Sequence, residues 1–108
     1  MEPEQDRPGK KLEELEFEWH PIKARANLKK HKVAFEEAST VFRDEKHLEI
    51  PDIDHSHDEI RYLAIGRSEN GRILTFIFTE RGKKIRLISA RLAETWERSE
   101  YESADERE

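Results

Sequence analysis

Two tight-turn signals divide residues 60–90 into three β-favouring segments, and this spacing constrains the fold more than any other feature of the chain. The dipeptide Asn70-Gly71 is the strongest short signal for a two-residue hairpin turn. A second turn is predicted at residues 80–83, "ERGK", where Gly82 can adopt a positive φ. Residues 72–79, "RILTFIFT", are nearly all apolar or β-favouring. We therefore place this segment in the middle of an antiparallel sheet.

The rest of the chain supplies helices and further strands. Pro21 suits the first turn of a helix, because the missing N–H has no partner there. Phe35, Ala38 and Phe42 recur on one face at helical spacing. The remaining predicted elements are a short strand, two helices, a strand and a closing helix, at residues 17–19, 20–31, 34–42, 46–50 and 92–102. The sequence thus predicts an α+β fold with two N-terminal helices, an antiparallel β-meander of about four strands and a C-terminal helix.

With 108 residues, the chain is long enough for one domain with one core. We expect a flexible arm at residues 1–14, a single domain at 15–102 and a frayed acidic tail at 103–108. Trp19 and Trp96 lie in amphipathic elements and are expected to join the core. The chain has no cysteine, which excludes disulfides and a thiolate zinc site. It shows no apolar segment of signal-peptide or membrane-spanning length, so we expect a cytoplasmic protein.

The charge is unevenly distributed along the chain, whose formal net charge is -5. Both ends are acidic, whereas residues 16–98 hold 16 basic and 15 acidic residues. Within this middle part, residues 81–91, "RGKKIRLISAR", hold five basic residues and no acidic one. The distribution therefore removes the objection to a nucleic-acid partner that the net charge alone would raise.

The basic segment 81–91 contains a predicted strand, and the strand period sorts its side chains onto two faces. The expected faces are Ile85, Leu87 and Ser89 against Lys84, Arg86, Ile88 and Ala90. Arg81 and Lys83 then lie near the turn and Arg91 at the far end. Such a row matches the spacing of phosphates along a nucleic-acid strand, and arginine can hold a phosphate through two hydrogen bonds. The alternative is an edge strand protected by lysines, or a solvated face.

Two other clusters offer chemistry. In residues 52–59, "DIDHSHDE", His55 and His57 alternate among carboxylates that could bind a metal, but the segment lacks a zinc-site spacing and is more typical of a solvated loop. In "NLKKH", residues 27–31, the cations favour the negative end of a helix dipole. There His31 is either a helix cap or a general base near neutral pH.

Three stretches together resemble the BrnT family of toxins: "FEWHPIKARANLKKHKVAFEEASTVF", "DHSHDEIRYLAIGRS" and "TERGKKIRLISARLAETWERSEYE". These toxins belong to type II toxin–antitoxin pairs, and their fold is similar to that of RelE-type ribonucleases. The resemblance extends from about Phe17 to Glu102. It implies an endoribonuclease that needs neither a metal nor another cofactor and that inhibits translation. It also implies a BrnA-like ribbon-helix-helix antitoxin, and operator DNA bound through that antitoxin.

The resemblance also implies site residues, which we carry over only where the sequence matches. Arg86, with Arg91 or Arg61, would stabilise the charged transition state. Glu80 or His31 would act as the base, and Tyr101 or a lysine would assist the leaving group. RNA-binding residues would be Lys29, Arg81, Lys83 and Lys84.

Two rival functions remain open on the sequence. A non-catalytic BrnT-like module would only pair with an antitoxin and co-regulate its promoter, with the basic strand receiving acidic partner residues. A metal-dependent hydrolase would use His55 and His57.

Three positions depart from the family pattern. Family members usually have Asp at His20, Gly at Lys32 and often Ser at Ala34. Asp and Ser are favoured N-caps, and Gly suits a left-handed helix end. We therefore expect looser helix ends here.

Overall fold

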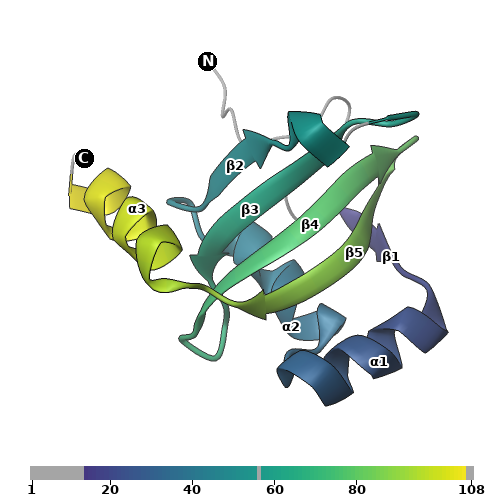
Figure 1. Cartoon of the computed structure of the whole chain (residues 1–108), viewed down its shortest axis with the longest axis horizontal. Helices are drawn as coiled ribbons and strands as arrows, with labels where there is room; N and C mark the ends of the chain where they lie inside the picture. The colour runs from purple at the N-terminus through teal and green to yellow at the C-terminus, as the bar shows by residue number, and fades with distance from the viewer. Residues whose placement is uncertain (1–13, 56, 107–108) are drawn as a thin grey trace.

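The computed structural model describes residues 14–55 and 57–106, which form one sheet with helices packed against it (Figure 1). The elements in chain order are β1 (Glu16–Glu18), α1 (Pro21–His31), α2 (Phe35–Ser39), the 3-10 helix η2 (Thr40–Arg43), β2 (Leu48–Pro51), the 3-10 helix η3 (Ile53–His55), β3 (Arg61–Arg67), β4 (Ile73–Arg81), β5 (Lys84–Leu92) and α3 (Thr95–Glu106). The arm predicted at residues 1–14 falls outside the described residues except for Glu14. Helix α3 continues four residues beyond position 102, where the predicted domain ends.

The sheet has five strands in the order β1-β5-β4-β3-β2, so β4 is the central strand, as predicted. Strands β2 to β5 form the antiparallel meander. The additional strand is β1, which pairs with β5 in parallel. Gly71 and Gly82 both have positive φ, which confirms a turn at each predicted position. The first turn is longer than the two-residue type, because β3 and β4 last pair at Arg67 and Ile73. The predicted α+β fold is therefore confirmed, with one strand more in the sheet.

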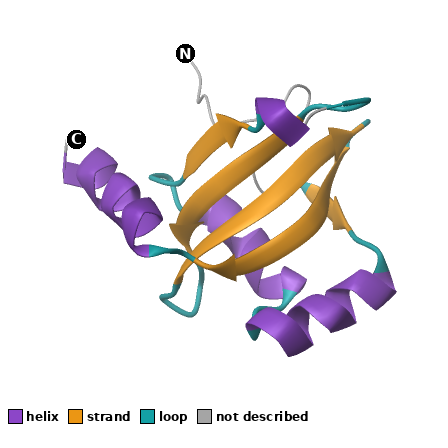
Figure 2. Ribbon diagram, viewed as in Figure 1, coloured by secondary structure: helices purple, strands orange, loops and turns teal. Residues whose placement is uncertain are grey.

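The core lies between the sheet and helices α1 and α2, which cover one of its faces (Figure 2). Phe42 is central to it, since its ring lies within 6 Å of the rings of Phe17, Phe76 and Phe78. Trp19 packs edge-on against Phe35, as expected of a core residue. The same expectation is wrong for Trp96, which is 55% exposed. Strand β5 runs to Leu92 and α3 begins only at Thr95, so Leu92 and Trp96 do not share a helical face.

The helix ends differ from expectation at one of the three departing positions. His20 replaces the usual Asp, but its Nδ1 accepts a hydrogen bond from the Ile22 N–H at 3.2 Å and so caps α1. The loose start expected for α1 is therefore wrong. Lys32 does adopt the left-handed conformation, with φ 62°, that favours glycine. Ala34 provides no side-chain cap for α2.

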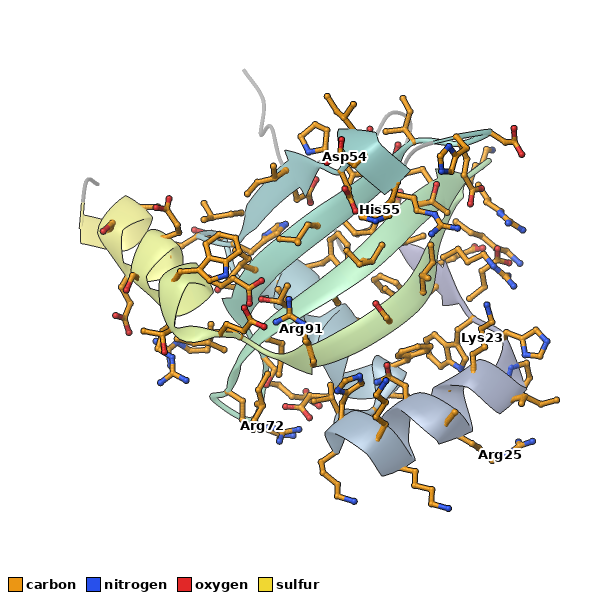
Figure 3. All side chains as sticks on the ribbon, in the orientation of Figure 1. Lys23, Arg25, Asp54, His55, Arg72 and Arg91 are labelled. Carbon is orange, nitrogen blue, oxygen red and sulfur yellow. The ribbon has the colours of Figure 1, made fainter. Side chains whose placement is uncertain are left out.

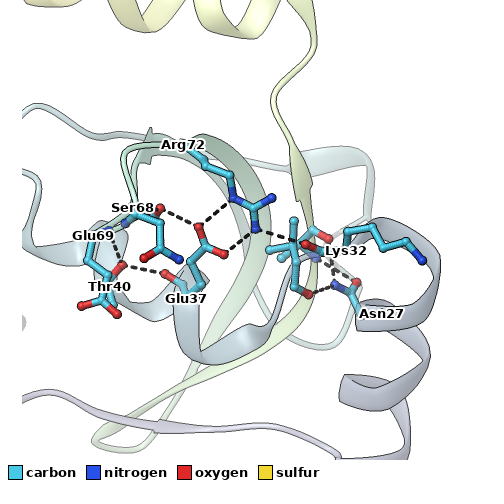
Figure 4. Close-up of polar contacts among 10 residues, drawn as sticks. Asn27, Lys32, Glu37, Thr40, Ser68, Glu69 and Arg72 are labelled. Atoms are coloured by element: carbon cyan, nitrogen blue, oxygen red, sulfur yellow. Dashed lines mark hydrogen bonds and ion pairs between the residues drawn. The ribbon is translucent and has the colours of Figure 1, made fainter.

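Two buried polar side chains tie the helices to the sheet. Asn27 donates to the carbonyls of Val33 and Ala90 and accepts from the Ala90 N–H. Glu37 accepts from Ser68 Oγ at 2.7 Å and forms a short ion pair with Arg72, whose Nη2 also donates to the Lys32 carbonyl (Figure 4). The hydrogen bond and charge of Arg72 lower the pKa of Glu37 despite its burial.

Strand β5 contains a bulge at Ile88, which corrects the predicted division of its faces. Phe78 pairs with Leu87 and Ile77 with Ser89, so Ile88 has no partner opposite it on β4. The side-chain alternation therefore shifts by one residue at this point. Ala90 joins Ile85 and Leu87 in the core, whereas Ser89 lies on the opposite face.

Candidate active site

The face of the sheet away from α1 and α2 is called here the open face, and a cavity of about 150 Å³ lies where one end of it meets the start of α1. Its charged and polar lining residues come from four regions of the chain: the start of α1, the loop before β3, and the outer ends of β3 and of the β4–β5 hairpin. These residues are His20, Lys23, Glu59, Arg61, Arg81 and Arg86. Arg61 and Arg86 are far apart in the sequence, but the pairing of β3 and β5 with β4 places them on either side of Thr79.

The cavity is positively charged, because four of these residues are cations and one is a carboxylate. Glu59 lies 3.4 Å from Arg81 and 3.9 Å from Arg61. Arg86 contacts Glu18 of β1 at 3.2 Å, so its guanidinium is held at the edge of the cavity. All four cations are on the rim of an open surface, where an anion can approach them. This arrangement suits an oxyanion such as a phosphate group.

The tautomer of His20 follows from its capping role. Because Nδ1 accepts the Ile22 N–H, it carries no proton, and the neutral ring must bear its proton on Nε2. In the neutral ring, His20 therefore has its N–H donor at Nε2.

The structure brings only some of the predicted site residues together. Arg61, Arg81 and Arg86 share the cavity. Lys83 and Lys84 are exposed at the nearby β4–β5 turn. Glu80 does not line the cavity, because its β5 partner is the core residue Ile85 and alternation turns it to the opposite face. The carboxylate in the cavity is Glu59 instead.

Arg91 lies at the other end of β5, beneath α3, and Tyr101 is on α3 itself (Figure 3 shows Arg91 well apart from Lys23 of α1). Both terminal nitrogens of Arg91 bind the carboxylate of Glu97, at 2.7 and 2.8 Å. Glu97 is fully buried and also accepts from Thr75 and from the Glu94 N–H. Burial raises the pKa of Glu97, but these hydrogen bonds outweigh it and hold the pKa below its usual value. Arg91 thus fastens α3 to the sheet.

Tyr101 is buried and donates its hydroxyl to Asp44 at 2.7 Å. Burial and this hydrogen bond raise the pKa of Tyr101 to about 12. The Tyr101 hydroxyl therefore joins α3 to Asp44, away from the cavity.

Lys29 and His31 lie on the last turn of α1, whereas Lys23 and His20 at its start reach the cavity. At 1.5 Å per residue, Lys29 is displaced from Lys23 by about 9 Å along the helix axis. These two predicted residues therefore lie away from the cavity and do not line it.

The histidine-rich loop shows a local ion pair. His55 Nδ1 lies 3.0 Å from Asp52, and both belong to the turn around η3. Among residues 14–55 and 57–106, no group of three or more possible ligands could hold a metal ion. In the same part of the chain, no helix is long and apolar enough to cross a membrane.

Sequence reasoning missed His20, Lys23 and Glu59 as cavity residues. His20 was considered only as a position that loses a favoured helix cap, and Lys23 was not singled out. The one available signal was the absence of any acidic residue between Glu18 and Glu36, which marks α1 as a basic helix. Glu59 carried no signal of its own, because its place depends on how the loop returns to β3.

The sequence model of one protein family, described as "Ribonuclease toxin, BrnT, of type II toxin-antitoxin system", matches residues 19–97. The chain belongs to the BrnT family. The predicted resemblance is thereby confirmed, and a type II system implies an antitoxin partner and an RNA target. No curated protein matches the chain.

The fold also agrees with a solved BrnT structure. The crystal structure of the Brucella abortus ribonuclease toxin BrnT superimposes with a TM-score of 0.59 at 23% sequence identity. The match covers 75% of this chain and 99% of the Brucella chain. At this identity the likeness shows a shared fold alone.

Proposed function

We propose that this BrnT-family protein is a metal-independent endoribonuclease that cleaves RNA at the cavity of Arg61, Arg81 and Arg86 and so inhibits translation. The single observation that carries this proposal is the convergence of four cations, one carboxylate and one imidazole in a single open cavity. RNA needs no metal for this reaction, because its own 2′-hydroxyl can attack the adjacent phosphorus. The protein must remove one proton, stabilise the added negative charge and protonate the departing 5′-oxygen.

The cavity residues can fill these roles. Arg61 and Arg86 flank Thr79 and present guanidinium groups to the phosphate oxygens, where charge builds up in the transition state. Glu59 is the carboxylate that can take the 2′-hydroxyl proton. Lys23 can give a proton to the 5′-oxygen as it leaves, and the Nε2–H of His20 can donate to the phosphate. The products would be a 2′,3′-cyclic phosphate and a 5′-hydroxyl end.

The partner proposed for this toxin is a BrnA-like ribbon-helix-helix antitoxin. Membership of a type II family supports an antitoxin, and the resemblance supports its class. The pair would then bind operator DNA through the antitoxin and repress its own promoter.

The proposal is tested by incubating the purified chain with total RNA in excess EDTA. We expect cleavage by the parent and a loss of about 100-fold or more for Arg86→Ala, by analogy with removal of one preorganised donor at a charged transition state. Arg25→Ala is the matched control, because Arg25 is exposed on α1 and does not line the cavity. Circular dichroism must show that each variant is folded, since Arg86 also contacts Glu18.

Cleavage that disappears in EDTA, or that Arg86→Ala leaves intact, contradicts the proposal. If the folded parent cleaves neither free RNA nor ribosome-bound RNA and does not arrest growth when induced alone, the chain is a binding module that only pairs with its antitoxin.

A further inference from the structure

Beyond the cavity, the open face of the sheet is organised in three rows that cross the strands. In the first row, Ile65 and Thr75 are buried and Arg91 is paired with Glu97, so α3 covers this row. The second row, called here the apolar row, consists of the apolar residues Ile50, Leu63 and Ile77 and ends at the polar Ser89, each a direct cross-strand neighbour of the next. The third is the basic row of Arg61, Thr79 and Arg86 at the cavity.

The apolar row is left uncovered within the described part of the chain. Ile50 is 44% exposed, and Leu63, Ile77 and Ser89 are half-buried. Neither Leu63 nor Ile77 belongs to the core cluster beneath α1 and α2. Figure 1 looks onto the open face with α2 behind the sheet, and none of the helices drawn there crosses the middle of the sheet. Apolar surface of this kind next to charge is typical of a binding site.

The two rows are two residues apart along each strand, which is about 7 Å. This separation is comparable to that between the phosphate of a nucleotide and its base. A phosphate on Arg61 and Arg86 therefore brings an attached base over Leu63 and Ile77. Every base has an apolar π-face, so such a contact tolerates any sequence. At the β5 end of the row, the Ser89 hydroxyl makes no hydrogen bond recorded within residues 14–55 and 57–106 and can contact a base edge.

We propose that the apolar row of Ile50, Leu63, Ile77 and Ser89 is a nucleobase subsite beside the phosphate-binding cavity. This inference rests on the proposed ribonuclease function and names its substrate as single-stranded RNA. A base can lie flat on the row only when it leaves the stack of a duplex. Charge complementarity favours a nucleotide as the occupant. Its phosphate is an anion that can bind the basic row, and its base is an apolar group at the right distance to contact the apolar row.

The test compares two probes that cannot be cleaved. One is a pool of random-sequence 2′-O-methyl octanucleotides, whose methylated 2′-oxygen cannot attack. The other is the same octamer chain without bases. We expect the parent to bind the pool about 5-fold or more tightly than the abasic chain, and Ile77→Thr to remove most of this difference. Binding of the abasic chain should not change. Leu63→Thr is a second variant, and Ile53→Thr, an exposed isoleucine outside the row, is the control.

Equal binding of both probes by the parent overturns the subsite. So does an equal loss on both probes in folded Ile77→Thr, which would show a structural role only. A variant that keeps RNA binding but loses the antitoxin assigns the row to the protein partner instead.

Arg86→Ala separates the two proposals, because it should weaken the binding of both probes. If Arg86→Ala weakens the binding of both probes and neither Ile77→Thr nor Leu63→Thr has an effect, the subsite is contradicted and the ribonuclease proposal is not. If the parent binds neither probe, the subsite is overturned, and the cleavage assay with free and ribosome-bound RNA decides the ribonuclease proposal.

Discussion

Arg86 and Arg91 show how the partner of a residue, more than its type, decides its role. Both lie on the open face of β5, and both matched the family pattern in sequence. Arg86 stands at the cavity with Glu18 beside it, whereas Arg91 has both terminal nitrogens on the buried Glu97. Glu97 is six residues away in the next element, and its pairing with Arg91 left no signal in the sequence. The sequence therefore predicted two equivalent cations. In the structure, Arg86 lies at the cavity, whereas Arg91 forms the ion pair with Glu97 that is called here the clamp.

The clamp predicts a specific dependence of stability on pH. The folded pKa of Glu97 is below its ordinary value of 4.5, so its contribution to stability is present above that value and is lost as the pH falls. Glu97→Gln should lower the free energy of unfolding by about 2 kcal/mol at pH 7, because Arg91 loses its charged partner. Urea denaturation at pH 7 and pH 3.5 should show a smaller loss on acidification in this variant than in the parent.

The control for this measurement is Glu100→Gln on the exposed side of the same helix. It should follow the parent at both pH values. Asp44 and Glu37 also have lowered pKa values, so the variant should retain part of the acid dependence. An unchanged pH dependence in Glu97→Gln would show that the clamp does not contribute.

At the scale of elements, Asn27 is a key residue, because its buried side chain hydrogen-bonds α1 to strand β5. Strand β1 pairs with β5 only as far as Arg86, so the edge of β5 beyond it needs other partners. Asn27 supplies them by bonding both the N–H and the carbonyl of Ala90. Its third hydrogen bond, to the Val33 carbonyl, holds the turn after α1.

Asn27→Asp should therefore destabilise the protein by about 3 kcal/mol, even though the side chains have the same shape. The substitution removes both donors and leaves the carbonyls of Val33 and Ala90 facing a carboxylate in a buried site. Urea denaturation measures the change, and Lys29→Ala on the same helix should shift the midpoint little. A shift for Asn27→Asp as small as that of Lys29→Ala would contradict the role given to Asn27.

Most elements could be predicted, because their signals are local. The Asn70-Gly71 turn, the glycine at position 82 and the apolar run of β4 each act within a few residues, and all three predictions are confirmed. The bulge at Ile88 could not be predicted, since it depends on how β5 aligns with β4. The start of α3 was placed too early for the same reason: pairing with β4 holds Leu92 in a strand.

At the scale of the whole molecule, a net negative charge coexists with a positive site. The acidic ends lower the net charge, but the cavity gathers Lys23, Arg61, Arg81 and Arg86 on one surface. Only part of this could be predicted. The basic strand was visible in sequence, whereas the contributions of α1 and of the loop before β3 needed the three-dimensional fold.

The local charge predicts that RNA binding depends on salt despite the acidic pI. Each phosphate neutralised on a single strand contributes about -0.7 to the slope of log K against log salt, so up to four contacts give about -2.8. Titrating the 2′-O-methyl pool between about 50 and 200 mM salt measures this slope. Arg86→Ala should make it shallower by about 0.7, and Arg25→Ala should not change it. A slope near zero in the parent would mean that the cavity does not bind phosphates.

The bulge at Ile88 also determines which face of the sheet each arginine of β5 occupies. Arg86 and Arg91 are an odd number of positions apart, which would place them on opposite faces of a regular strand. They share the open face because Ile88, the bulge residue between them, has no partner on β4. The strand is thus two half-strands in opposite phase, with the cavity on one and the clamp on the other. Loss of Ile88 would remove the bulge and leave an even interval, so a regular strand would still hold both arginines on the open face. The odd interval between Arg86 and Arg91 and the bulge at Ile88 therefore require each other.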